Sequence, residues 1–244
     1  MAVLNSRYQD SALNQVAAFT DGAGGALKTM QVVQKTARLV NEVRKEAGFQ
    51  YAPTLSTLDS KLGTAVSCLN LPRIPGACKS AISSLSALST ASATVTEANK
   101  KTLTAVKDSL DLVSTIGNAA ALITVNPVIK TVTTLTDFAK DVTDLGLVSQ
   151  DVYLVTEMQK KVENGTDEMK TAIDDTRNTL LLNLAKTVMS VTSGILGLFM
   201  LACGAPLLPS IALIVISLSS TVFGMASNFY ETTRPYQKVN LYSA

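Results

Sequence analysis

The residue types that usually carry enzyme chemistry are scarce in this 244-residue chain. Histidine, the commonest general base and metal ligand, is absent. The three cysteines, Cys68, Cys78 and Cys203, do not have the spacing of metal ligands, and their odd number argues against a disulfide framework. We therefore expect reduced thiols, no metal site and no cofactor.

One acidic cluster is a candidate for paired-carboxylate chemistry, and it consists of Asp167, Glu168, Asp174 and Asp175. Basic residues are interleaved with these acids, namely Lys160, Lys161, Lys170 and Arg177. Alternating charge of this kind is typical of a solvated, salt-bridged helix face. We expect no catalysis there and predict that the protein is not an enzyme.

Basic residues near the N-terminus suggest contact with an anionic surface. An amphipathic helix is expected over 26–47, with a basic stripe at three- and four-residue spacing that contains Lys28, Lys35, Arg38 and Lys45. Such a helix packs in a bundle or lies on an anionic membrane, and the absence of Trp favours the bundle. A net charge of +2 is too small to indicate a nucleic-acid surface.

The rest of the chain is organised around a stretch from Thr187 to Tyr230 that contains no charged residue. It is about twice the roughly 20 residues that one membrane-spanning helix needs. A glycine and two prolines interrupt it within 204–209, so we predict a hairpin of apolar helices over about 187–203 and 207–230. The residues that we assign to this hairpin are Leu196, Phe199, Leu201, Gly204, Pro206, Pro209, Ile214, Phe223 and Gly224.

The basic residues Arg177, Lys186, Arg234 and Lys238 flank the hairpin, whereas its turn has none. This distribution predicts that both ends of the hairpin face the cytosol. Two alternatives stay open: a wedge in one leaflet, because the first arm is short, and the central helix pair of a soluble core. Helices of a soluble core usually carry a polar stripe on one face, and the lack of any charged residue on either arm argues against that alternative.

The remaining sequence predicts an all-α protein. Apolar residues recur at three and four positions over 128–162, which is a strong helix signal, and further helices are expected over 55–71 and 166–177. The small-residue segment 77–98 fits either a close-packed helix or a loose connection. We expect a cytosol-facing helical region over 1–178, the transmembrane hairpin over 179–234 and a short cytosolic tail over 235–244.

In its order of segments the chain resembles the peroxisomal membrane-elongation peroxins, a family that includes glycosomal membrane proteins. The likeness lies in Phe19–Gly22 with Leu27–Gln31 and Val33–Val40, then in Leu58–Ser60 and Leu62–Ala65, and finally in Leu135–Val162 followed by the apolar hairpin. The resemblance implies a multi-pass protein of the peroxisomal or glycosomal membrane with both termini in the cytosol. It also implies an amphipathic segment on the cytosolic leaflet, self-association and recruitment of organelle-fission machinery.

The sequence departs from the family in the segment that corresponds to its membrane-remodelling helix. The cations of that segment are only Lys61, Arg73 and Lys79, and prolines interrupt it at 72–76. We do not expect one continuous helix through this point. The helix over 26–47 would then contribute more to membrane binding than its counterpart in the family.

Three functions follow as hypotheses. The leading one is a membrane protein that shapes, elongates or divides peroxisomes or glycosomes by inserting amphipathic helices into the anionic cytosolic leaflet and by self-association. The second is a metabolite pore of the same membrane, built from several hairpins and lined by their hydroxyl side chains, which are Ser190, Thr192, Ser193, Ser217, Ser220 and Thr221. The third is a bacterial effector that inserts two apolar lobes into a vacuole membrane.

Overall fold

The computed structural model describes residues 23–92, 94–124, 126–162, 165–204, 206, 208–233 and 241. Helices form all of the regular structure in these ranges. They are α2 (Ala23–Glu46), α3 (Pro53–Asn70), the 3₁₀ helix η2 (Leu71–Arg73), α4 (Ile74–Ala87), α5 (Val95–Ile123), α6 (Pro127–Lys161), α7 (Asp167–Cys203) and α8 (Ser210–Thr233). The all-α prediction is confirmed. Phe19–Gly22, Arg234, Lys238 and nearly all of the predicted tail lie outside the described residues.

Side-chain caps mark where the long helices begin. The Thr94 hydroxyl accepts a hydrogen bond from the backbone N–H of Glu97, and the Thr166 hydroxyl accepts one from the backbone N–H of Met169. The side-chain oxygen of Asn126 accepts one from the backbone N–H of Val128. Each cap satisfies a backbone donor that the first helical turn leaves free. At the other end of α7, Gly204 adopts a left-handed conformation with φ of 68°, which glycine reaches without strain and which ends the helix.

Pro72 and Pro75 lie where α3 ends and α4 begins. The α3 helix ends at Asn70, one 3₁₀ turn follows, and α4 begins at Ile74 with Pro75 in its first turn, where a missing amide proton costs nothing. The expected interruption is therefore present, although it is short. The segment 77–98 is partly a close-packed helix, since Ala77, Ala81 and Ser84 are buried in α4, and partly the connection to α5.

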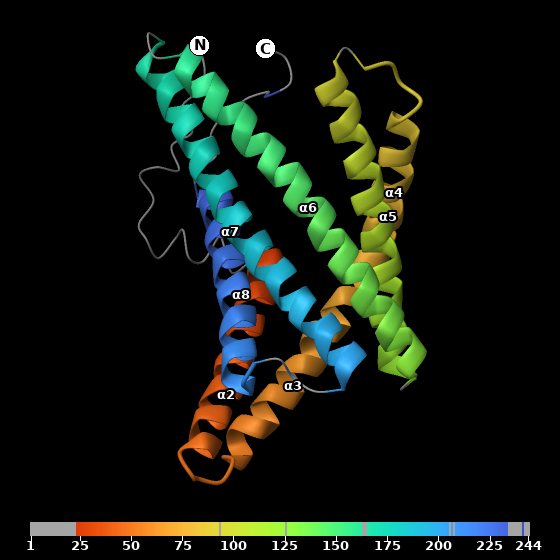
Figure 1. Ribbon diagram of the computed structural model, residues 1–244, viewed down its shortest axis with the longest axis vertical. Coiled ribbons are helices and arrows are strands. Elements are labelled where there is room, and N and C mark those ends of the chain that lie inside the picture. Colours follow the sequence, from red (N-terminus) through yellow and green to blue (C-terminus); the bar gives the residue numbers. More distant parts are fainter. Residues whose placement is uncertain are drawn as a thin grey trace.

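Successive helices pack side by side, α4 on α5, α5 on α6, α6 on α7 and α7 on α8 (Figure 1). The chain also closes on itself, because α2 packs along α8 as well as on α3. Helix α2 therefore lies against the second arm of the hairpin, and two segments from opposite ends of the sequence meet there. This arrangement positions the site described below.

The interior of the described structure is unusually polar. Its buried polar residues are Asn41, Ser84, Ser114, Thr115, Thr133, Thr136, Asp175, Thr176, Thr179, Thr187, Thr221 and Ser227, whereas several buried apolar residues are only alanines. Large apolar side chains are exposed on every helix from α2 to α8, for example Val40, Ile82, Val113, Leu135 and Phe199. Water-soluble proteins usually show the opposite distribution. An apolar outer surface of this extent indicates contact with lipid or with other protein chains.

Helices α7 and α8 are both long and apolar enough to cross a membrane. Only 11% of the apolar window in α7 and 17% of that in α8 is buried, so these helices are not the enclosed pair of a soluble core. The charged segment that begins at Asp167 continues into the apolar arm without a break. The expected boundary at 178/179 thus falls inside a single helix.

Candidate functional site

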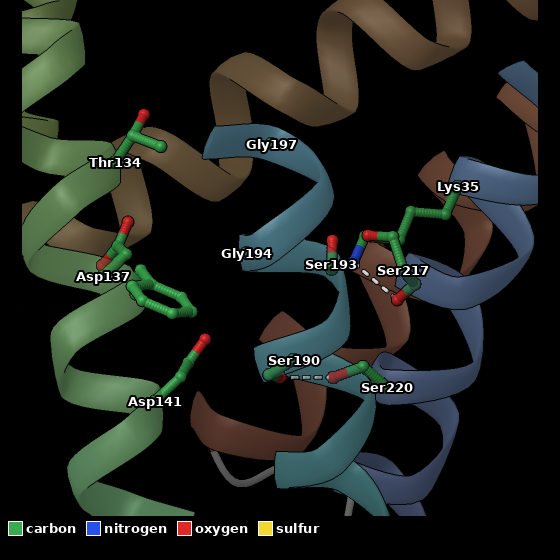
Figure 2. Close-up of a pocket in the computed structure, with 11 residues that line it drawn as sticks. Lys35, Thr134, Asp137, Asp141, Ser190, Ser193, Gly194, Gly197, Ser217 and Ser220 are labelled. Carbon is green, nitrogen blue, oxygen red and sulfur yellow. Dashed lines mark hydrogen bonds between the residues drawn. The ribbon is translucent and has the colours of Figure 1, made fainter. Parts of the chain in front are cut away.

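A polar cavity of about 290 Å³ lies between α6, the two arms of the hairpin and α2 (Figure 2). Its lining consists of Lys35 from α2, Thr134, Asp137, Phe138 and Asp141 from α6, Ser190, Ser193, Gly194 and Gly197 from α7, and Ser217 and Ser220 from α8. The α7 and α8 residues recur at helical spacing, so one face of each arm points into the cavity. Small and hydroxyl side chains on both faces leave the space open.

Hydrogen bonds between side chains hold the two hairpin arms together. The hydroxyl oxygens of Ser190 and Ser220 are 2.7 Å apart, and the Ser220 hydroxyl also lies 3.3 Å from the Lys186 carbonyl oxygen. Further along the same interface, the Ser227 hydroxyl donates to the Asn183 side-chain oxygen at 2.8 Å. Interhelical hydrogen bonds of this kind are a common means of joining helices in membranes.

Lys35 reaches the hairpin from α2. Its ammonium group donates to the Ser217 carbonyl oxygen at 3.0 Å and to the Thr221 hydroxyl at 2.6 Å. Burial, together with the positive charges of Lys28 and Arg38, lowers the pKa of Lys35 to about 8. The two hydrogen bonds therefore fix a partly desolvated cation at one side of the cavity.

The α6 wall carries two carboxylates. Asp137 accepts a hydrogen bond from the Ser114 hydroxyl and lies 3.9 Å from the Lys140 ammonium. Within the described part of the chain, Asp141 has no hydrogen-bond or ion-pair partner. Burial raises the pKa of Asp141, the charges of Lys140 and Lys186 oppose that change, and those of Asp137 and Asp144 reinforce it. Asp141 is thus the carboxylate of this cavity that is available to a ligand.

Gly194 allows α6 and α7 to approach at the cavity. A Cβ atom at this position would lie 2.7 Å from Cδ2 of Phe138, so a larger residue would require that ring to move. Gly197, one turn further along α7, has open space around it. The small residues at 190 and 194 therefore serve contacts within the chain.

The predicted membrane-surface cations do not share one surface. Lys28 and Lys35 are partly buried against neighbouring helices, and burial followed by the charge of Lys186 lowers the pKa of Lys28 to about 8. Arg38 binds Asp59 of α3 through two hydrogen bonds of 3.1 and 3.0 Å. Helical spacing predicts that these cations form one stripe on α2. In the structure that stripe contacts α3 and α8. The expected role at lipid head groups therefore does not fit Lys28 and Lys35.

The other predicted cations are more accessible. Lys45 is exposed at the end of α2, with its ammonium group 5.7 Å from the centre of the Tyr51 ring. Lys61 and Lys79 are exposed on α3 and α4. Arg73 lies 3.9 Å from a carboxylate oxygen of Asp111 on α5.

The predicted hairpin residues fall into three environments. Phe199 and Leu201 are exposed on α7, as lipid-facing residues would be, whereas Leu196 is buried and Ile214 and Phe223 are partly buried. Gly204, Pro206 and Pro209 are exposed in the turn. Gly224 is buried beneath the Lys186 side chain, whose Cδ would lie 3.3 Å from an added Cβ.

The acidic cluster at 167–175 does not form one face. Asp167, Glu168 and Asp174 are exposed, and Asp174 accepts a hydrogen bond from Gln159. Asp175 is only 4% exposed and accepts a hydrogen bond from the Tyr230 hydroxyl at 2.7 Å. The expectation of a solvated face was therefore wrong for Asp175, which joins the two hairpin helices. The described residues contain no group of three or more His, Cys, Asp or Glu side chains that could hold a metal ion.

Sequence reasoning identified the hydroxyl residues of the hairpin as a possible pore lining, and four of them do line the cavity. It did not identify Asp137 and Asp141, and it assigned Lys35 to the membrane surface, whereas the structure places Lys35 in the cavity lining. The spacing of four between Asp137 and Asp141 was the available signal, because it places both acids on one face of α6. No local pattern connects Lys35 to the hairpin.

Comparison with known proteins adds no assignment, because no family model, curated protein or solved structure shows a significant match to this chain. The peroxin resemblance therefore stays a prediction, and function has to be argued from the site.

Proposed function

We propose that this chain is an integral membrane protein that passes small polar solutes along the cavity between α6 and the hairpin. The observation that carries the proposal is that α7 and α8 each have a polar face toward the cavity and an apolar face on the outside. Their inner faces place Ser190, Ser193 and Ser220 in the cavity, and their outer faces expose Ile195, Phe199, Val215 and Val222.

This arrangement agrees with the physical chemistry of a bilayer. Exposed apolar side chains are stable against lipid, whereas polar and charged side chains within a membrane face the bundle interior or a water-filled cavity. The cavity volume of about 290 Å³ is at the lower limit for small-molecule sites, so the solute is smaller than a typical drug. Self-association of several chains would enclose the open side of the cavity.

Proteoliposomes that contain the full chain provide the test. We expect osmotic swelling in glycerol that exceeds the rate of protein-free vesicles. Ser193→Leu fills the cavity and should reduce the rate to that background. Thr192→Leu is the matched control, since its position is adjacent on α7 but does not line the cavity. Equal swelling of both variants would exclude this cavity as the route, and no swelling with the wild-type chain would refute the proposal.

Membrane shaping is a second proposal, and a different observation supports it. The α2 side chains Val33, Val40 and Val43 are exposed next to Arg44 and Lys45, an arrangement that suits insertion into an anionic leaflet. In this proposal the hairpin anchors the chain and α2 adds area to the cytosolic leaflet of a peroxisome or glycosome, with fission machinery as the partner.

Two measurements test membrane shaping. Full-length protein should convert anionic liposomes into tubules, and replacing Val33, Val40 and Val43 with serine should abolish tubulation while Val113→Ser on α5 leaves it intact. A fluorescent fusion should localise to peroxisomes or glycosomes. Labelling of a bacterial-effector target such as a vacuole membrane would instead favour the third hypothesis.

A further inference from the structure

The charged groups of the cavity are unequally available to a ligand. Lys35 already donates two hydrogen bonds to α8, and Asp137 already accepts one from Ser114. Asp141 has no such partner among the described residues. Figure 2 shows its side chain extending from the α6 wall toward Ser190 on the α7 wall.

The remaining lining supplies groups that suit a cation. Ser190, Ser193 and Ser220 provide hydroxyl oxygens, whose lone pairs attract a cation whether or not it can donate a hydrogen bond. Phe138 provides an aromatic ring, whose face attracts organic cations. The residues that line the cavity carry a formal charge of −1, from Lys35 (+1), Asp137 (−1) and Asp141 (−1). The ammonium groups of Lys28, Lys140 and Lys186 act on Asp141 from outside this lining.

A second cavity of about 450 Å³ shares Thr134 and Asp137 with the first and extends toward the turn between α5 and α6. Its charged lining consists of Lys130 and Asp137, with formal charges of +1 and −1 that sum to zero. Among the residues that line the two cavities, Asp141 is thus the carboxylate without a hydrogen-bond or ion-pair partner.

We propose that the cavity beside the hairpin binds a small organic ammonium ion, with the Asp141 carboxylate as its counter-ion and with Phe138 and the serine hydroxyls completing the site. This inference deepens the proposed function and rests on it, because it names the class of solute that the route prefers. A divalent metal ion is a poorer fit, since such ions take several oxygen ligands, including more than one carboxylate in tight sites.

The test compares two fluxes in the same proteoliposomes. Tetramethylammonium is the charged probe, because it keeps its charge at every pH and cannot cross the lipid as a neutral base. Glycerol is the neutral probe. We expect wild-type protein to pass tetramethylammonium faster than glycerol, and Asp141→Asn to remove this preference while glycerol flux persists. The persisting glycerol flux shows that the variant is folded.

Two further variants sharpen the result. Asp141→Glu retains the charge and should retain most of the preference, whereas Asp174→Asn changes an exposed acid outside the cavity and should have no effect. If wild-type protein passes glycerol but shows no preference that depends on Asp141, the ammonium site is refuted and the proposed route stands. If neither solute passes, both proposals fail.

Discussion

The Lys35 ammonium group lies 2.6 Å from the hydroxyl of Thr221, a residue that stands 186 positions later in the sequence. This hydrogen bond ties the N-terminal part of the described chain to the middle of the second hairpin arm. It also explains why a lysine from the expected membrane-surface stripe is turned inward. A partly buried ammonium group is stable here only while its N–H groups remain hydrogen-bonded.

The stability of the protein should therefore depend on pH through Lys28 and Lys35. Both pKa values fall from an unfolded value of 10.5 to about 8 in the folded chain. Between these values the unfolded state binds more protons than the folded state, so the free energy of unfolding rises with pH from about 8 to 10.5. Below pH 8 both states are protonated, and the cost of burying the two charges is fully present.

Thermal unfolding in detergent micelles at pH 7 to 10 tests this prediction. The unfolding midpoint of the wild-type chain should increase over this range, and the double variant Lys28→Met and Lys35→Met should flatten the profile. Lys61→Met, which changes an exposed lysine of α3, is the control and should leave the slope unchanged. A slope in the double variant as steep as that of the wild type would contradict the assignment.

The contact between Gly194 and Phe138 should limit what α7 tolerates at the cavity. Gly194→Ala forces Phe138 away from α7, and overpacking of this kind usually destabilises by about 1–3 kcal/mol. Gly197→Ala meets open space and should gain up to about 1 kcal/mol from its higher helix propensity. Unfolding midpoints of the two variants should move in opposite directions, and a shared shift would show that Phe138 does not need the glycine.

The hydrogen bond between Ser190 and Ser220 should contribute modestly to pairing of the hairpin arms. Such bonds in membrane proteins have an average coupling energy of about 0.6 kcal/mol. A double-mutant cycle with Ser190→Ala and Ser220→Ala, read by unfolding in detergent, should yield favourable coupling of this size. Coupling near zero would mean that the two hydroxyls bond elsewhere, for example Ser220 to the Lys186 carbonyl.

The orientation of the hairpin can be measured with cysteine chemistry. Cys203 is exposed at the end of α7, whereas Cys68 and Cys78 lie on α3 and α4. In sealed vesicles with the cytosolic face outward, the variant Cys68→Ser, Cys78→Ser should resist a membrane-impermeant maleimide. Vesicles of the opposite orientation should be labelled at Cys203.

The control for this experiment is Cys203→Ser, which retains the exposed Cys68 and should react from the cytosolic side. Labelling of Cys203 from that same side would place the turn in the cytosol. Protection of Cys203 in both orientations would instead favour a wedge that stays within one leaflet.

Features that depend on neighbouring residues were predictable from the sequence. The absence of charge between Thr187 and Tyr230 is a property of composition, and the end of α7 at Gly204 follows from local backbone chemistry. The caps at Thr94, Asn126 and Thr166 have the same local origin. These features determined the all-α fold and the hairpin.

The cavity and its charges were decided only by tertiary structure. Helical spacing shows that Lys28, Lys35 and Arg38 share a face, but it does not show whether that face meets lipid, α3 or α8. Asp141 becomes a candidate site only because α6 packs against the serine face of α7. Contacts between segments far apart in the chain depend on how whole helices pack, and no local pattern of residues determines that packing.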